Sequence, residues 1–164
     1  MVENNSDFNV KNTGILLISH GSRHPLASET FNQIADMFRK ESDFKVNVGY
    51  MEIHEPNIPK AVNELVEGTE IDTIVAVPVF LAHGMHTTRD IPNILGLNDD
   101  EEHGKQGEKD EHTKHEENHH GHHHHHHDIE KIDFDGKIIY TDPLGADSLV
   151  IEIIKNRVHD ALKM

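Results

Sequence analysis

Residues Thr13–Ser19 read TGILLIS, a short and continuous apolar run. Such a run is typical of a strand that is buried on both faces of a parallel sheet. A second run, IDTIVAVPVF, follows at Ile71–Phe80, and weaker strand patterns lie at Phe44–Met51 and Lys137–Thr141. Phe44–Met51 is less apolar than the first run, which favours a position at the edge of the sheet.

Helical patterns alternate with these strands, because apolar residues recur there every three or four positions. They lie at Leu26–Lys40, Thr87–Leu97 and Ala146–Leu162, and in a further segment that begins around Pro56 and Pro59 and is stopped by Gly68. Strands alternating with helices predict an α/β fold, with a doubly wound, mostly parallel four-stranded sheet and helices on both faces. We expect the last helix to build its face from Leu149, Val150, Ile153, Ile154 and Val158.

One stretch interrupts the alternation and is rich in histidine. Residues 98–131 include HTKHEENHHGHHHHHHD at positions 112–128 and almost no apolar side chains. This composition cannot offset the entropy lost on ordering, so a disordered loop is predicted. The 164-residue chain is therefore interpreted as a flexible tail over residues 1–12 and a single domain over residues 13–164, interrupted by this loop.

Composition excludes several classes of function. The formal net charge is −15 with neutral histidines, and residues 98–131 contribute −7 of it, from eleven acids against four lysines. The remainder is still acidic, which argues against nucleic acid as a partner. Because the chain has no cysteine, disulfides, thiolate metal sites and thiol nucleophiles are excluded. With no visible signal peptide or membrane-spanning run, we expect a cytoplasmic protein without a membrane partner.

Polar residues gather where the predicted strands end. In doubly wound sheets ligands bind outside the carboxyl ends of the strands. The segments at this edge are residues 19–24, 52–55, 81–90 and 142–145. They carry two glutamates, Glu52 and Glu55, and five of the six histidines outside the loop: His20, His24, His54, His83 and His86.

A single histidine after a strand is most often an ordinary loop residue. His20 and His86, however, follow separate strands close to Gly21 and Gly84, in a chain without cysteine, and this favours a function for both. The two glycines would permit tight turns and close approach of the backbone to a ligand, unless they are ordinary turn residues.

Other residues at this edge have two interpretations each. Glu52 and Glu55 are either solvated carboxylates or an acid/base partner of the histidines, and Glu55 is preferred because Pro56 makes the turn stiff. Arg23 and Arg89 are either surface charges or ligand contacts. Met85 is interpreted as a packing residue. Ser22 is not a nucleophile, because the G-x-S-x-G pattern is absent.

At these residues the chain resembles a known family. The resemblance is carried by ISHGSRHP (18–25), MEIHEPNIPKAV (51–62), VPVFLAHGMHTTRDIP (77–92) and DPLGAD (142–147). These segments are similar to the small CbiX-type sirohydrochlorin chelatases of archaea, a group that inserts nickel or cobalt. The similarity covers the chain outside the tail and the loop, and a histidine-rich loop at this point is familiar in the group.

The resemblance implies a role for each matching position. His20 would be the catalytic proton acceptor and a metal contact, and His86 the second metal histidine. Glu55 would be catalytic and contact the substrate, although variable spacing leaves Glu52 open for that role. Ni²⁺ or Co²⁺ would be the substrate ion, with no permanently bound cofactor, and the protein would act as a homodimer. The tetrapyrrole would bind at Leu81, Ala82, His83, Gly84, Met85 and His86.

The chemistry of insertion agrees with imidazole ligands. A neutral imidazole binds cobalt and nickel, and its pKa makes it a usable base near neutrality. Sirohydrochlorin carries many carboxylates, so Arg23, Arg89 and backbone N–H groups near Ser22 and Thr87 are expected to compensate their charge.

The run of six consecutive histidines in the loop is a separate candidate for metal binding. It lacks groups to orient its rings, so it is not expected to be the catalytic site. It is interpreted either as delivering metal to that site or as a solvated loop. The candidate residues for metal delivery are His122, His123, His124, His125, His126 and His127.

The predicted function is insertion of Ni²⁺ or Co²⁺ into sirohydrochlorin with release of two protons. The product would serve biosynthesis of the nickel coenzyme of methanogenesis, of cobalamin, or of both. One alternative is a histidine-rich nickel or cobalt storage protein or metallochaperone without catalysis, which leaves the residues at the strand ends unexplained. A second alternative is insertion of iron on the route to siroheme.

Overall fold

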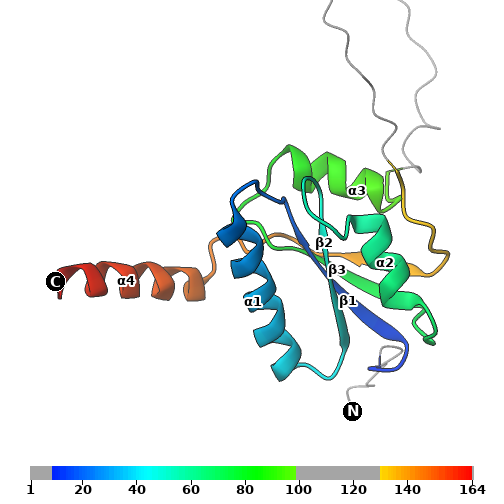
Figure 1. Ribbon diagram of the computed structural model, residues 1–164, viewed down its shortest axis with the longest axis horizontal. Coiled ribbons are helices and arrows are strands. Elements are labelled where there is room, and N and C mark those ends of the chain that lie inside the picture. The colour runs from blue at the N-terminus through cyan, green and yellow to red at the C-terminus, as the bar shows by residue number, and fades with distance from the viewer. Residues whose placement is uncertain (1–8, 99–129, 164) are drawn as a thin grey trace, which may run out of the picture.

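The computed structural model describes residues 9–98 and 130–163 (Figure 1). Its strands are β1 (Thr13–Ser19), β2 (Lys45–Tyr50), β3 (Thr73–Pro78) and β4 (Lys137–Tyr140). All neighbouring pairs are parallel, and the order across the sheet is β2-β1-β3-β4. The predicted four-stranded parallel sheet is confirmed, and β2 lies at an edge as expected.

The helices are α1 (Pro25–Glu41), α2 (Ile58–Val66), α3 (Ile91–Ile94) and α4 (Ser148–Leu162). A π-helical segment, η1 (His86–Asp90), directly precedes α3. The sequence predicts one regular helix at Thr87–Leu97, and the structure divides this region into η1 and α3. π-Helical turns are rare and have no sequence pattern of their own, so periodicity alone predicts the helix and not its winding.

Two hydrophobic clusters cover the two faces of the sheet. On one face, Phe31 and Ala35 of α1 pack with Ile15 and Leu17 of β1 and with side chains of β2. On the other face, α2 and α3 pack on the alternate residues of β1 and β3, with Leu16, Ile18, Leu65, Ile74 and Ile91 at most 1% exposed. The expected coverage by helices on both faces is confirmed. Because all neighbouring strands are parallel, their carboxyl ends lie at one edge of the sheet.

Helix α4 forms where it is predicted, but it buries no residue against the rest of the chain. Figure 1 shows it extending away from the sheet as an arm. Its apolar side chains are exposed, including Leu149 at 71%, Ile153 at 56% and Ile154 at 53%. The expectation of a helix is confirmed, and its predicted apolar face is exposed, because an apolar stripe predicts burial without saying against which surface.

The predicted tail and loop fall mainly outside the described residues. Of the tail, residues 9–12 form a turn that ends with a hydrogen bond from the Thr13 amide to the Asn9 carbonyl, 3.0 Å long. After the loop, Ile132 and Phe134 pack against the core cluster of α2 and α3. No helix in the described ranges has the length and apolar character needed to cross a bilayer.

All six histidines that are candidates for metal delivery also lie outside the described residues. The residues concerned are His122, His123, His124, His125, His126 and His127. Their role in metal delivery therefore stays a prediction, and the site is built below from the histidines of the described ranges.

Candidate functional site

His20 and His86 converge at the carboxyl edge of the sheet. His20 directly follows β1, and His86 begins η1 after the connection from β3. Their Nε2 atoms lie 3.1 Å apart, and the rings meet edge to face, with centroids separated by 4.7 Å. The sequence predicts this convergence, and the structure produces it within a single chain.

The second nitrogen of each ring has a partner that fixes where the ring proton sits. The Nδ1 atom of His20 lies 2.9 Å from the Gly21 carbonyl oxygen, and that of His86 lies 2.9 Å from Oδ2 of Asp90. A carbonyl or carboxylate oxygen can only accept, so each Nδ1 donates and each neutral ring presents a lone pair at Nε2.

Two lone pairs at this separation repel each other unless a cation, either a proton or a metal ion, lies between them. With metal–nitrogen distances of about 2.0–2.1 Å, two nitrogens 3.1 Å apart subtend an angle of roughly 100° at the metal. The pair can therefore act as a bidentate site for a divalent ion. Within the part of the chain that the structure describes, no cluster of three or more His, Asp or Glu residues could hold a metal.

Asp90, which sequence reasoning missed, supports His86 from four residues further along the helix. Its Oδ1 atom accepts a 2.8 Å hydrogen bond from Nε of Arg89, while Oδ2 accepts from His86. Burial by itself would raise the pKa of Asp90, but hydrogen bonds and charge from Arg89 and His86 outweigh it and lower the pKa below its ordinary value. The i, i+4 spacing of His86 and Asp90 is the signal that could have revealed it.

Arg89 pairs with Asp90, and its predicted contact with a substrate carboxylate stays a prediction. Its Nε atom donates a hydrogen bond to Oδ1 of Asp90, 2.8 Å long. Arg23, the other predicted cation, lies exposed at the same edge of the sheet.

The segment that carries His86 is anchored through Thr87. At its start, the Gly84 amide donates to Oγ1 of Thr87, which in turn donates to the Gly84 carbonyl. From β4, the Tyr140 hydroxyl donates a 2.9 Å hydrogen bond to the Thr87 carbonyl. Burial, with a smaller contribution from the charge of Asp142, raises the pKa of Tyr140 to about 12.

The loop that carries His20 is held by the loop after β2. The parallel pairing continues beyond the strands, since the Met51 amide donates to the Ser19 carbonyl and the Glu52 amide to the His20 carbonyl. Gly21 has φ of 93°, and a Cβ atom there would lie 2.0 Å from the Glu52 carbonyl oxygen. Glycine is therefore required at position 21 by the neighbouring loop, and the predicted approach of its backbone to a ligand stays a prediction. Gly84 has open space around it, so no such approach requires glycine there.

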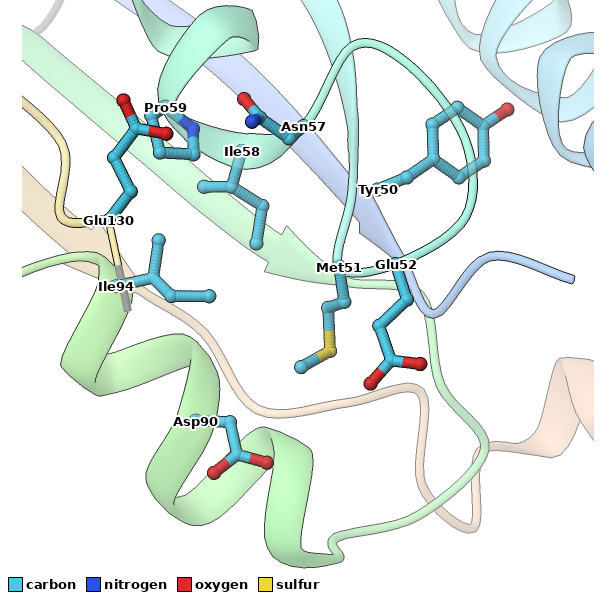
Figure 2. Close-up of a pocket in the computed structure, with 9 residues that line it drawn as sticks. All are labelled: Tyr50, Met51, Glu52, Asn57, Ile58, Pro59, Asp90, Ile94 and Glu130. Atoms are coloured by element: carbon cyan, nitrogen blue, oxygen red, sulfur yellow. The ribbon is translucent and has the colours of Figure 1, made fainter. Parts of the chain in front are cut away.

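Beside this site lies a cavity of about 410 Å³, between the loop after β2 and the helices η1 and α3 (Figure 2). Its lining combines apolar Met51, Ile58 and Ile94 with the carboxylates of Glu52 and Asp90. Figure 2 shows the Met51 and Glu52 side chains extending from the loop and Asp90 on the neighbouring helix. The cavity thus reaches from an apolar wall to the carboxylate that supports His86.

Of the two candidate glutamates, Glu52 lines this cavity and Glu55 does not. The Glu55 carboxylate accepts a hydrogen bond from the Asn57 amide and lies 3.6 Å from Nζ of Lys60. These contacts hold the start of α2. Glu52, the alternative to the preferred Glu55, is therefore the glutamate that faces the cavity beside the histidine pair, and the choice of the functional carboxylate stays a prediction.

The segment predicted to bind substrate lines a second cavity, of about 510 Å³, with Ala82 and His83 on one side and residues 142–147 on the other. His83 lies 3.4 Å from the Asp142 carboxylate. Leu81 and Met85 are 64% and 58% exposed. The interpretation of Met85 as a packing residue is therefore wrong for this chain, because its neighbours leave its side chain in solvent.

The two remaining histidines of this edge have local contacts. His24 caps α1 by accepting a hydrogen bond from the Leu26 amide. His54 contacts the Ser22 carbonyl through Nε2, and its ring lies against Tyr50. They belong to the framework of the two loops, which leaves His20 and His86 as the facing pair.

The fold and this pair define a parallel α/β protein with two imidazoles facing one another at the carboxyl edge of its sheet. The chain belongs to the CbiX family, whose profile matches residues 14–161. It is 50% identical over 149 residues to the sirohydrochlorin cobaltochelatase of Methanothermobacter thermautotrophicus, covering 91% of this chain and 92% of that protein. It is 45% identical to the protein of that name from Methanopyrus kandleri, covering 90% and 96%.

Solved structures show the same fold. A cobalamin biosynthesis CbiX protein from Marinobacter aquaeolei superimposes with a TM-score of 0.61 at 22% identity, covering 92% of this chain and 95% of that one. The sirohydrochlorin chelatase SirB from Bacillus subtilis subspecies spizizenii, in complex with cobalt, gives 0.63 at 20% identity. The match covers 91% of this chain and 50% of SirB.

Proposed function

We propose that this protein inserts a divalent ion, Co²⁺ or Ni²⁺, into sirohydrochlorin. The observation that carries the proposal is the pair of Nε2 atoms, 3.1 Å apart, on rings whose Nδ1 positions are both engaged. Archaeal relatives named sirohydrochlorin cobaltochelatase, at 45–50% identity over nearly their whole length, support the same substrate. The ion is a substrate of this reaction and leaves within the product.

Insertion requires that the ion loses its water and that two pyrrole N–H groups lose their protons. Two imidazoles without a thiolate bind the ion weakly enough to release it into a ring of four nitrogens. As the ion passes to the pyrrole nitrogens, the Nε2 lone pair of His20 becomes free, and His20 is proposed to accept a pyrrole proton there, since a neutral imidazole is a usable base near neutral pH. Glu52, on the wall of the adjoining cavity, is proposed to receive the second proton.

The tetrapyrrole is proposed to lie over the Leu81–His86 segment. Exposed Leu81 and Met85 offer apolar contacts to the macrocycle. Arg23 is proposed to pair with a substrate carboxylate.

The test mixes the purified protein with sirohydrochlorin and Co²⁺, Ni²⁺ or Fe²⁺ and follows the initial rate of insertion by absorbance. We expect Co²⁺ and Ni²⁺ to be inserted faster than Fe²⁺, and His20→Ala or His86→Ala to lower kcat/KM by a factor of about 100 or more. His159→Ala, on the remote helix α4, is the matched control and should keep full activity.

A storage protein would behave differently. It would retain bound cobalt or nickel without transferring it, and His20→Ala would hardly change the amount bound. Rates with sirohydrochlorin that stay at the uncatalysed level in the unmodified protein would therefore contradict the proposed function.

The protein is also proposed to work as a homodimer in which α4 of one copy packs on the other. Its exposed apolar side chains need a surface, and the α1 face of the sheet offers one. On that face Val75, Val77 and Val79 of the β3 region are only partly buried. Met37, on α1 itself, is 63% exposed.

A further inference from the structure

We propose that Asp90 is a positioning residue for the metal site: it fixes the proton of His86 on Nδ1 and thereby keeps the Nε2 lone pair aimed at the ion. This inference rests on the proposed function, because it assigns a role within that same site. In this assignment Asp90 acts through His86 and is not itself a ligand of the ion.

Four groups form one chain of contacts across the site. Nε of Arg89 donates to Oδ1 of Asp90, Oδ2 of Asp90 accepts from Nδ1 of His86, and Nε2 of His86 faces Nε2 of His20. The side chain of Asp90 is only 19% exposed, while that of Arg89 is 58% exposed. The carboxylate is thus held from both oxygens before any ligand arrives.

The two histidines are supported unequally. His20 donates to the backbone carbonyl of Gly21, which no substitution can remove. His86 depends on a side chain, so its ring orientation and tautomer can be altered by changing one residue. Partners of this kind behind a metal-binding histidine typically change metal affinity by a factor of about 10–100.

The position of Arg89 makes one substitution especially informative. In Asp90→Asn the side chain keeps its shape but has one oxygen and one amide nitrogen. Arg89 can only donate, so it attracts the oxygen and turns the amide NH₂ toward His86. An NH₂ group needs an acceptor, which forces the proton of His86 onto Nε2 and removes the lone pair that would bind the metal.

The experiment measures Co²⁺ binding by titration and the His86 tautomer by nitrogen NMR of the full chain, with ring signals assigned against His86→Ala. We expect Asp90→Asn to weaken Co²⁺ binding about 10- to 100-fold and to move the His86 proton from Nδ1 to Nε2. His86→Ala also gives the background binding of the other histidines. Asp36→Asn is the matched control, since Asp36 pairs with Arg39 on α1, and should change neither readout.

Two further variants distinguish a positioning role of Asp90 from a general loss of structure at the site. In the His86→Ala background, Asp90→Asn should cause no additional loss of Co²⁺ affinity. In Arg89→Ala/Asp90→Asn the amide can rotate, so part of the affinity and the Nδ1 tautomer should return. An equal loss in both backgrounds, or an unchanged tautomer in Asp90→Asn, would overturn the assignment.

Neither readout uses sirohydrochlorin. A protein that fails to insert metal would contradict the proposed function while leaving the Co²⁺ titration and the tautomer as a valid test of Asp90. Conversely, an unchanged tautomer in an active enzyme would contradict the role of Asp90 alone.

Discussion

Gly21 lies where the His20 loop crosses the loop after β2, and its conformation is one that other residues rarely adopt. Its φ is 93°, and an added Cβ would meet the Glu52 carbonyl oxygen at 2.0 Å. We expect Gly21→Ala to lower the free energy of unfolding by more than about 2 kcal/mol, because both the backbone and its neighbour must shift. Urea denaturation measures the loss.

Gly84→Ala is the control for this substitution. Gly84 also lies on a loop at this edge, but nothing approaches its Cβ position within 4 Å. Its free energy of unfolding should change by no more than about 0.5 kcal/mol. Equal losses at the two glycines would show that their different surroundings do not matter.

At the scale of single residues, sequence reasoning finds the side chains that directly follow strands. It misses a side chain whose role is to position another side chain. His20 and His86 were predictable because each comes just after a buried strand, and parallel strands end at one edge. Asp90 was not, since its role depends on the ring atom of His86 that it contacts. The choice between Glu52 and Glu55 depends on where two side chains turn within one loop.

At the scale of elements, the four strands and the helices α1, α2 and α4 were predictable from apolar patterns, but the π-helical winding of η1 and the contacts of α4 were not. An isolated amphipathic helix with side chains such as Leu149 at 71% exposure is costly in water. We expect Ile153→Lys/Ile154→Lys to halve the solution mass measured by light scattering, because two charges cannot be buried in the proposed dimer.

Lys155→Ala is the matched control for α4. Lys155 pairs with Glu152 on the solvent side of the same helix, so its removal should leave the mass unchanged. A doubly substituted chain that keeps the mass of the unmodified protein would contradict the proposed docking of α4.

At the scale of the whole molecule, Tyr140 joins β4 to the segment that carries His86. Its pKa is raised to about 12 in the fold against an ordinary value of 10.0. A raised pKa means that the protonated form stabilises the fold, so the contribution is complete below about pH 10 and is lost as the pH rises through about 12. The free energy of unfolding should therefore fall over that range.

Tyrosinate absorbance provides the measurement, because the chain has two tyrosines and no tryptophan. We expect Tyr140→Phe to abolish the ionisation step near pH 12 and to leave that of Tyr50, whose pKa burial also raises. Two native tyrosines that both ionise at the ordinary value would contradict the burial of these hydroxyl groups.

The Ile132 amide donates a 2.9 Å hydrogen bond to the Ile94 carbonyl and so joins the chain before residues 99–129 to the chain after them. The chain departs from the core and rejoins it at adjoining points, so the length of what lies between hardly affects the rest. By loop-closure entropy, doubling such a connection costs only about 0.6 kcal/mol. A longer or shorter connection between these two points should therefore leave the two imidazoles in place.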